Sequence, residues 1–78
     1  MAKNIIVLDA VLTGKKIHEV IHESGCSVKQ LQGMLGLSCP QPIYRWMNGK
    51  ILPSVDNLYR LGKIFKMHME DMLVEKRT

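Results

Sequence analysis

The sequence predicts an all-α fold in which five short helices form a compact bundle, and three observations predict it. Apolar residues recur along the chain at the three- and four-residue spacing of amphipathic helices. A glycine, a proline or a capping serine stands at most of the expected helix ends, where turns begin or stop. The 78 residues contain no internal repeat and no low-complexity linker, and a chain of this length has room for a single hydrophobic core.

The first two helices are expected over residues 11–24 and 28–35. Gly25 suits the left-handed residue that follows a helix, and Ser27 with Gln30 has the spacing of a capping box for the second helix. The inward face of the first helix comprises Ile17, Val20, Ile21 and Ser24. The apolar stripe of the second helix comprises Leu31, Met34 and Leu35.

The third helix is expected over residues 40–48, ending at an asparagine-glycine turn. We expect Cys39 to be its N-cap, because Pro40 and Pro42 then fall among the first helical positions, whose amides have no partner within the helix. A cap one residue earlier would make Pro42 delete the first helical hydrogen bond. The position of the cap therefore decides whether the second proline is tolerated.

The fourth helix is expected over residues 55–65, with Ser54 as its N-cap, and a short fifth helix over residues 69–74. The inward residues of the fourth helix are Leu58, Leu61, Ile64 and Phe65. The chain then divides into an apolar N-terminal segment that is extended or packs in a dimer, a helical domain and a basic tail, over residues 1–12, 13–74 and 75–78.

Composition and charge limit the classes of function that the protein can have. Lysine and arginine (11) outnumber aspartate and glutamate (7), giving a net charge of +4, which suits a polyanionic partner. Cys26 and Cys39 are too few for a disulfide scaffold, and we expect them to be small, buried, reduced thiols. Asp9 interrupts the N-terminal apolar stretch, and no apolar run approaches the roughly 18 residues of a membrane span. We therefore expect a cytoplasmic protein without a signal peptide or membrane helix.

The eight residues that begin at His18 read HEVIHESG, the pattern of a zinc-protease helix. His18 and His22 have the required spacing, but this chemistry also needs a third metal ligand, and Val28 stands where the extended pattern would place it. With the apolar face inward, both histidines fall on the opposite, solvated arc. We therefore expect no catalytic residue, no metal or other cofactor and no enzyme, with adventitious zinc capture by the two histidines as the alternative.

Residues 27–50, SVKQLQGMLGLSCPQPIYRWMNGK, are the most informative segment. A helix, a turn at Gly36 and a second helix form a helix-turn-helix, in which Leu37 can fill the gap between the helices. The apolar side of the third helix comprises Ile43, Trp46 and Met47, and its opposite side comprises Gln41, Tyr44, Arg45 and Asn48. An amide, a phenol and a guanidinium can bond base edges in a major groove. A solvated face that binds nothing is the alternative.

These residues resemble the phage-repressor-like helix-turn-helix family (Cro/cI type, also called XRE). They look closest to a bacterial branch that reads S-P-Q-A-I-Y-K-W and L-P-S-x-D-N-L at these places. The resemblance covers about residues 13–73, and its most specific part is the combination W-x-N-G-K, L-P-S and D-N-L between Trp46 and Leu58. It implies a five-helix, lambda-repressor-like DNA-binding domain that is usually dimeric and regulates transcription.

The resemblance also implies roles for individual residues. Those that match the family's base-contacting surface are Gln41, Tyr44 and Arg45, and those that match its phosphate contacts are Lys29, Asn48, Gly49 and Lys50. Free backbone amides at the turn after the third helix would suit phosphate oxygens. Three positions depart from the family pattern. Gln32 replaces a small alanine, so the third helix is expected slightly further out; Pro42 replaces an alanine; and His68 replaces the residue that usually opens the fifth helix.

The sequence therefore predicts a regulator of transcription, more often a repressor than an activator, that binds specific double-stranded DNA. We expect it to act at the nucleoid as a homodimer, with residues 40–48 in the major groove. A protein-interaction module of the same fold, such as an antitoxin, is the alternative. Its partner surface would be the N-terminal segment or the methionines Met67, Met69 and Met72, which are otherwise core filler.

Overall fold

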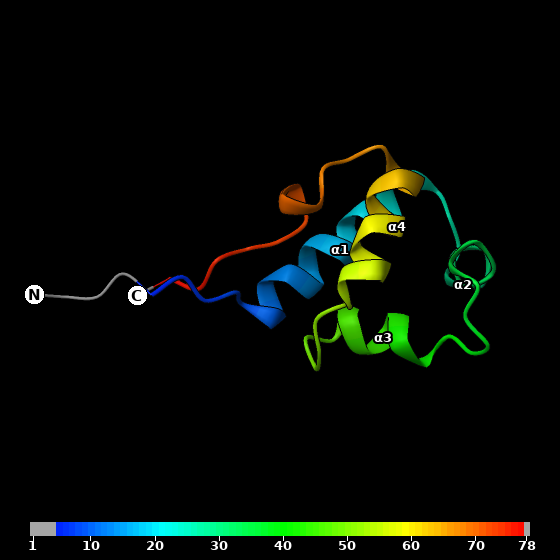
Figure 1. Cartoon of the computed structure of the whole chain (residues 1–78). Helices are drawn as coiled ribbons and strands as arrows, with labels where there is room; N and C mark the ends of the chain where they lie inside the picture. The colour runs from blue at the N-terminus through cyan, green and yellow to red at the C-terminus, as the bar shows by residue number, and fades with distance from the viewer. Residues whose placement is uncertain (1–4, 78) are drawn as a thin grey trace, which may run out of the picture.

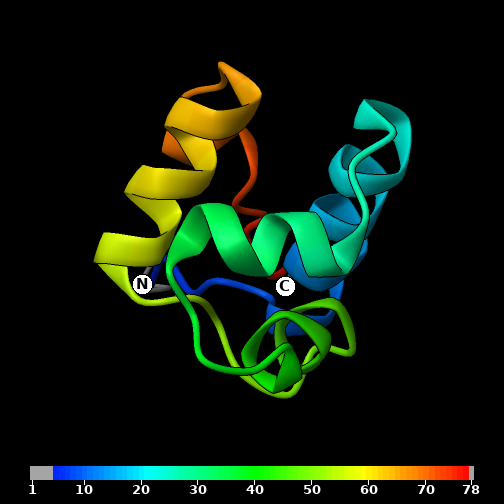
Figure 2. The same cartoon turned by 90° about the vertical axis from the view of Figure 1, so that its right-hand side faces the viewer.

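The computed structural model describes residues 5–77, and over these residues the fold is all-α apart from one isolated β-bridge. Its elements are α1 (Ala10–Ser24), α2 (Val28–Leu35), α3 (Gln41–Met47), α4 (Val55–Phe65) and a single 3-10 turn, η1 (Met69–Asp71). Figure 2 shows α2 lying across the space between α1 and α4, with α3 below it. The all-α class is confirmed. None of the described helices is long and apolar enough to cross a bilayer.

Local sequence signals account for most helix ends. The capping box is present, because Ser27 Oγ accepts the Gln30 N–H at 3.0 Å and Gln30 Oε1 accepts the Ser27 N–H at 2.9 Å. Ser54 caps α4 as expected. Asp9 begins α1, because its carboxylate accepts the Leu12 N–H at 2.9 Å. Helix α1 therefore starts one residue before the position predicted from its apolar pattern.

The start of α3 differs from the prediction. Its N-cap is Pro40, not Cys39, and no side chain caps the helix. The Pro40 carbonyl accepts the amides of Ile43 at 3.0 Å and Tyr44 at 3.3 Å, so the chain enters the helix through a tighter turn. Pro42 lies within the first turn, where its missing N–H removes no helical bond.

A single core lies between the helices. Its most deeply buried apolar side chains are Ile17, Leu31, Ile43, Leu61 and Met72. Three expectations about burial are wrong. Met34 is 52% exposed, because the short α2 buries only the Leu31–Leu35 line. Ser24 is exposed and its hydroxyl donates to the Ile21 carbonyl of its own helix. Cys39 is exposed, because it lies in the loop before α3.

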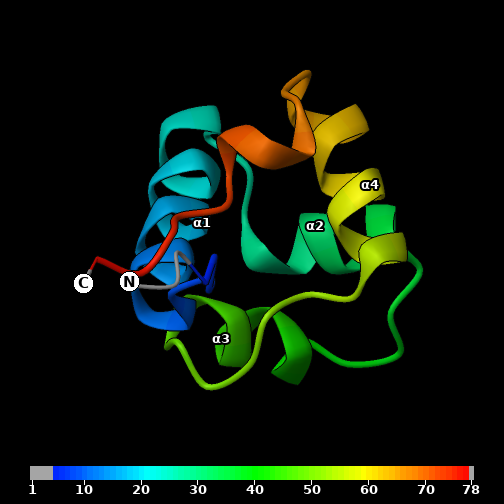
Figure 3. The ribbon, with the colours of Figure 1, turned by 60° about the vertical axis from the view of Figure 1, so that its left-hand side comes forward.

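The predicted fifth helix is wrong beyond its first turn. Residues 69–71 form the 3-10 turn, His68 provides no side-chain cap, and the chain then runs extended along α1 (Figure 3). Val74 explains the change, because its N–H donates to Thr13 Oγ1 at 3.0 Å and its carbonyl accepts the Asp9 N–H at 2.7 Å. These tertiary hydrogen bonds replace the ones that a longer helix would make.

The two ends of the described chain lie together. Leu8 pairs with Glu75 in an antiparallel bridge, and the Lys76 N–H donates to the Val7 carbonyl at 2.7 Å. The expected N-terminal segment is thus extended over residues 5–9, while its first four residues lie outside the described part. Of the expected basic tail, residues 75–77 are described and Thr78 is not.

Thr13→Val is expected to lower the free energy of unfolding by about 1–2 kcal/mol. Thr13 is completely buried, and valine keeps its shape but leaves the Val74 N–H without an acceptor. Urea denaturation measures the loss. Thr13→Ser is the control, because it keeps the hydroxyl and should retain the extended path of residues 73–77. Equal stability of wild type and Thr13→Val would contradict this role of the hydroxyl.

Candidate nucleic-acid interface

Helix α3 is held in place by an unusually close approach to α1. A Cβ atom built on Gly14 of α1 would overlap the carbonyl oxygen of Trp46 and lie 3.0 Å from the carbonyl oxygen of Met47 and 3.1 Å from the Gly49 nitrogen. The backbones of the two elements are therefore in direct contact at a buried position. Gly14 is not among the residues predicted from the sequence to be important, although a glycine inside a helical pattern can have such a packing role.

The two faces of α3 have the predicted division. Ile43 is completely buried and Trp46 is 3% exposed, so the indole is part of the core as expected. On the opposite side the side chains of Gln41, Tyr44 and Arg45 are exposed together. All three views place α3 at the lower edge of the molecule, with no other helix below it (Figures 1, 2 and 3). An amide, a phenol and a guanidinium thus share one accessible helical face.

The turn after α3 does not offer the free amides that were expected. The N–H groups of Asn48, Gly49 and Lys50 donate to carbonyls within α3, at 2.9, 3.1 and 2.9 Å. Gly49 has a φ of 72°, and a Cβ added to it would lie 2.8 Å from the Cα atom of Val11. Gly49 is therefore a structural residue at which the turn packs on α1. At this turn, contacts to an anion are left to the exposed side chains of Asn48 and Lys50.

Gln32 holds the turn between α2 and α3. The side-chain amide of Gln32 donates to the backbone carbonyl of Leu37 at 3.3 Å, and the backbone carbonyl of Gln32 accepts the Leu37 N–H at 3.0 Å. Leu37 packs against the core as predicted, and Gly36 has the left-handed conformation, with a φ of 69°. The long side chain that was expected only to push α3 outward therefore makes a specific bond. Lys29 lies exposed in the first turn of α2.

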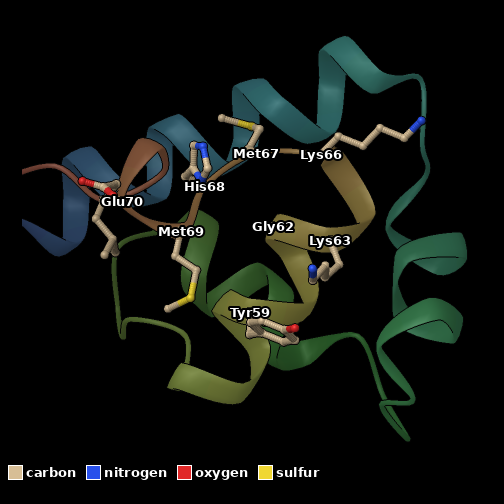
Figure 4. Close-up of a pocket in the computed structure, with 9 residues that line it drawn as sticks. Tyr59, Gly62, Lys63, Lys66, Met67, His68, Met69 and Glu70 are labelled. Carbon is tan, nitrogen blue, oxygen red and sulfur yellow. The ribbon is translucent and has the colours of Figure 1, made fainter.

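Two hollows of the surface lie away from the exposed side chains of α3, although Lys29 lines the second of them. One, of about 750 Å³, lies at the end of α4 and is lined by residues of α4 and the segment that follows it (Figure 4). The other, of about 640 Å³, lies between the end of α1 and the start of α2. Residues of α3 line neither hollow.

Among the described residues, the two histidines of the HEVIHESG stretch have no third metal-ligating side chain near them. His18 and His22 are exposed on α1, and within residues 5–77 no three histidine, cysteine, aspartate or glutamate side chains are grouped to hold a metal ion. Val28, which stands where the zinc-protease pattern would place the third metal ligand, is half-buried and packs against the core. Both histidines therefore lie on the solvent-exposed face of α1.

Dialysis against a metal chelator is expected to leave the far-UV circular dichroism and the melting temperature unchanged. The fold needs no metal if His18 and His22 are solvated side chains, because metal-dependent small domains unfold when the metal is removed. The double variant His18→Ala/His22→Ala serves as the control and should melt like wild type. Loss of helicity after dialysis, restored by zinc, would contradict this expectation.

Comparison with known proteins supports the fold. No protein-family model matches the chain, and no curated protein sequence matches it. Among solved structures, the chain is similar to the crystal structure of the restriction-modification controller protein C.AhdI from Aeromonas hydrophila. The TM-score is 0.73 at 20% sequence identity, and the match covers 82% of this chain and 96% of that chain. The two proteins share a fold over nearly the whole of C.AhdI.

Proposed function

We propose that this protein binds specific sequences of double-stranded DNA and regulates transcription, with α3 in the major groove. The observation that carries the proposal is the exposed face of α3, where Gln41, Tyr44 and Arg45 project together from a helix fixed from behind by Ile43 and Trp46. An α-helix fits the major groove, where each base pair presents a distinct pattern of donors and acceptors. The similarity to a controller protein adds support from fold alone.

Each exposed side chain has a matching role on DNA. The Arg45 guanidinium suits the O6 and N7 acceptors of guanine, and the Gln41 amide suits the N6 and N7 atoms of adenine. The Tyr44 hydroxyl, on a 47% exposed side chain, can bond a base edge or a nearby phosphate. The exposed side chains proposed to contact phosphates are Lys29, Asn48 and Lys50. Such contacts fix the register of the protein on the duplex.

We propose that the protein acts as a homodimer and as a repressor. One seven-residue helix reads only a few base pairs, whereas two copies can read two half-sites about 34 Å apart on one face of the duplex. A dimer bound over a promoter represses by occupying it. Selection of bound oligonucleotides from a random pool tests the proposal, because it should return an inverted repeat with that spacing. Recovery of no enriched sequence would contradict it.

Lys50→Ala is expected to weaken binding to all DNA sequences by a similar factor. A lysine that contacts a phosphate adds no sequence preference but releases a counterion, so its loss should reduce the slope of log K against log salt by about one. Fluorescence anisotropy with the selected duplex and with a scrambled duplex measures both quantities. A selective loss on the selected duplex alone would instead assign Lys50 to base recognition.

A protein-interaction module is the second candidate function, and the hollow at the end of α4 favours it. Met67, Met69 and Leu73 line this hollow together with Lys63 and Lys66 (Figure 4), which suits an apolar partner segment with acidic residues. Met72 does not belong to such a surface, because it is completely buried and fills the core, which was the main expectation for these methionines. Salt separates the two functions, because DNA binding weakens steeply as salt rises and apolar association does not.

A further inference from the structure

The two ends of the described chain form a two-stranded arm, defined by residues 5–9 and 74–77. It is held by the Leu8–Glu75 bridge and by the hydrogen bonds Asp9 N–H to Val74 O and Lys76 N–H to Val7 O, each 2.7 Å long. The arm extends away from the helices (Figure 1), in a molecule that measures 48 × 23 × 21 Å. A two-stranded ribbon with no further cover is only marginally stable in water.

The N-terminal strand of the arm exposes apolar side chains on both faces. Successive side chains of a strand point to opposite sides, so Ile5 and Val7 occupy one face and Ile6 and Leu8 the other. Their exposed fractions are 72%, 76%, 47% and 37% for Ile5, Ile6, Val7 and Leu8. An exposed apolar edge strand is a feature that folded proteins normally cover or break up with charges.

The backbone of this strand has one free edge. The bonds to residues 74–76 use the Val7 carbonyl and the Asp9 amide. In an antiparallel pair, the N–H and C=O groups of alternate residues point to opposite sides of the strand. Those of Ile6 and Leu8 therefore point to the outer edge, where they have no hydrogen-bond partner among the described residues. The edge offers two donors and two acceptors.

We propose that this outer edge pairs, antiparallel, with the same edge of a second copy of the chain. The free groups fix the register. Ile6 of one copy lies opposite Leu8 of the other, and the two residues exchange both hydrogen bonds, so that Val7 lies opposite Val7 of the second copy on the two-fold axis. An identical strand satisfies every free donor and acceptor, and the two Ile6 and two Leu8 side chains cluster on one face. The result is a four-stranded sheet shared by two copies.

The proposed interface rests on the proposed function, to which it adds the geometry of the dimer, but the interface itself can be tested without DNA. Two recognition helices must lie about 34 Å apart. Gly49, at the end of α3, packs on Val11, and the four residues from Val11 back to Val7 span at most about 14 Å. The middle of α3 is about 8 Å from Gly49. A two-fold axis at Val7 can therefore lie about 17 Å from each α3, as the DNA spacing requires.

Disulfide cross-linking tests the register. In a background of Cys26→Ser and Cys39→Ser, oxidised Val7→Cys should run as a covalent dimer, because Cα atoms of a non-hydrogen-bonded antiparallel pair lie about 4.5 Å apart. Ile6→Cys is the matched control, since two copies of position 6 are offset by two residues and lie beyond the roughly 7 Å limit for a disulfide. Equal cross-linking of both variants, or none, would overturn the register.

Ile6→Pro tests the edge itself by analytical ultracentrifugation without DNA. It removes an outward N–H and leaves the bonds of Val7 and Asp9 in place, so the dimer dissociation constant should rise at least tenfold while helicity stays the same. Ile6→Val keeps the N–H and should associate like wild type. A monomeric wild type at 100 μM, assemblies larger than two chains, or a dimer that Ile6→Pro does not weaken would overturn the proposal. Failure to bind DNA would leave it intact and would refute only the proposed function.

Discussion

Gly14→Ala is expected to lower the free energy of unfolding by about 3 kcal/mol, which for a domain of this size lowers the melting temperature by about 15 °C. The added methyl group would overlap the Trp46 carbonyl and crowd the Met47 carbonyl and the Gly49 nitrogen. All three neighbours are backbone atoms, which cannot turn aside as a flexible side chain can. Helix α3 would have to move away from α1, although alanine has the higher helix propensity.

Gly33→Ala is the matched control for this prediction. Gly33 is also inside a helix, α2, but nothing lies within 4 Å of a Cβ atom added there. The substitution should therefore stabilise the protein by about 0.5–1 kcal/mol through helix propensity. Thermal and urea unfolding of the two variants measure the opposite signs. A Gly14→Ala variant as stable as wild type would show that α3 does not depend on the close contact.

Arg45→Ala is expected to weaken binding to the selected DNA by about 1–3 kcal/mol and to relax the preference at one base position per half-site. The reason is the bidentate geometry of a guanidinium on guanine, which no water molecule or neighbouring side chain reproduces. Arg45 is exposed on α3, so the substitution should leave the melting temperature close to that of wild type. Binding to a panel of single-base variants of the duplex measures the change in preference.

Lys63→Ala is the control for the loss of one positive charge. Lys63 lies in the last turn of α4, where its ammonium group is 5.3 Å from the centre of the Tyr59 ring. Its removal should weaken binding only slightly and without a change in sequence preference. If Arg45→Ala left both affinity and preference like those of the control, the assignment of α3 as the base-reading helix would be wrong.

Helices α2 and α4 and the two faces of α3 could be predicted well because their signals are local. The bounds of α2 and α4, the capping box at Ser27 and the left-handed Gly36 all follow from residues a few positions apart, and the structure confirms them. The burial of Trp46 and the exposure of the opposite face of α3 follow from helical periodicity in the same way. The roles of the exposed residues on DNA stay predictions.

One error arises where distant residues compete with a local pattern, and two others concern the hydrogen bonding of a turn and the coverage of a helix. The expected fifth helix gives way to an extended segment, because Thr13 and Asp9 offer Val74 hydrogen bonds that no pattern within residues 69–74 reveals. The expected free amides after α3 are already bonded within the helix. Met34 fits the apolar stripe by spacing, yet it is exposed because α2 is covered along only one line.

The sequence by itself determined the four α-helices, to within one residue at each end, and which side of α3 faces outward, because capping and periodicity act within one or two helical turns. Only the tertiary structure decided how closely α3 approaches α1, through Gly14, and that the chain ends pair as an arm. These features depend on contacts between residues 30 to 70 positions apart. Such contacts form only when packing brings the segments together, so no local pattern encodes them.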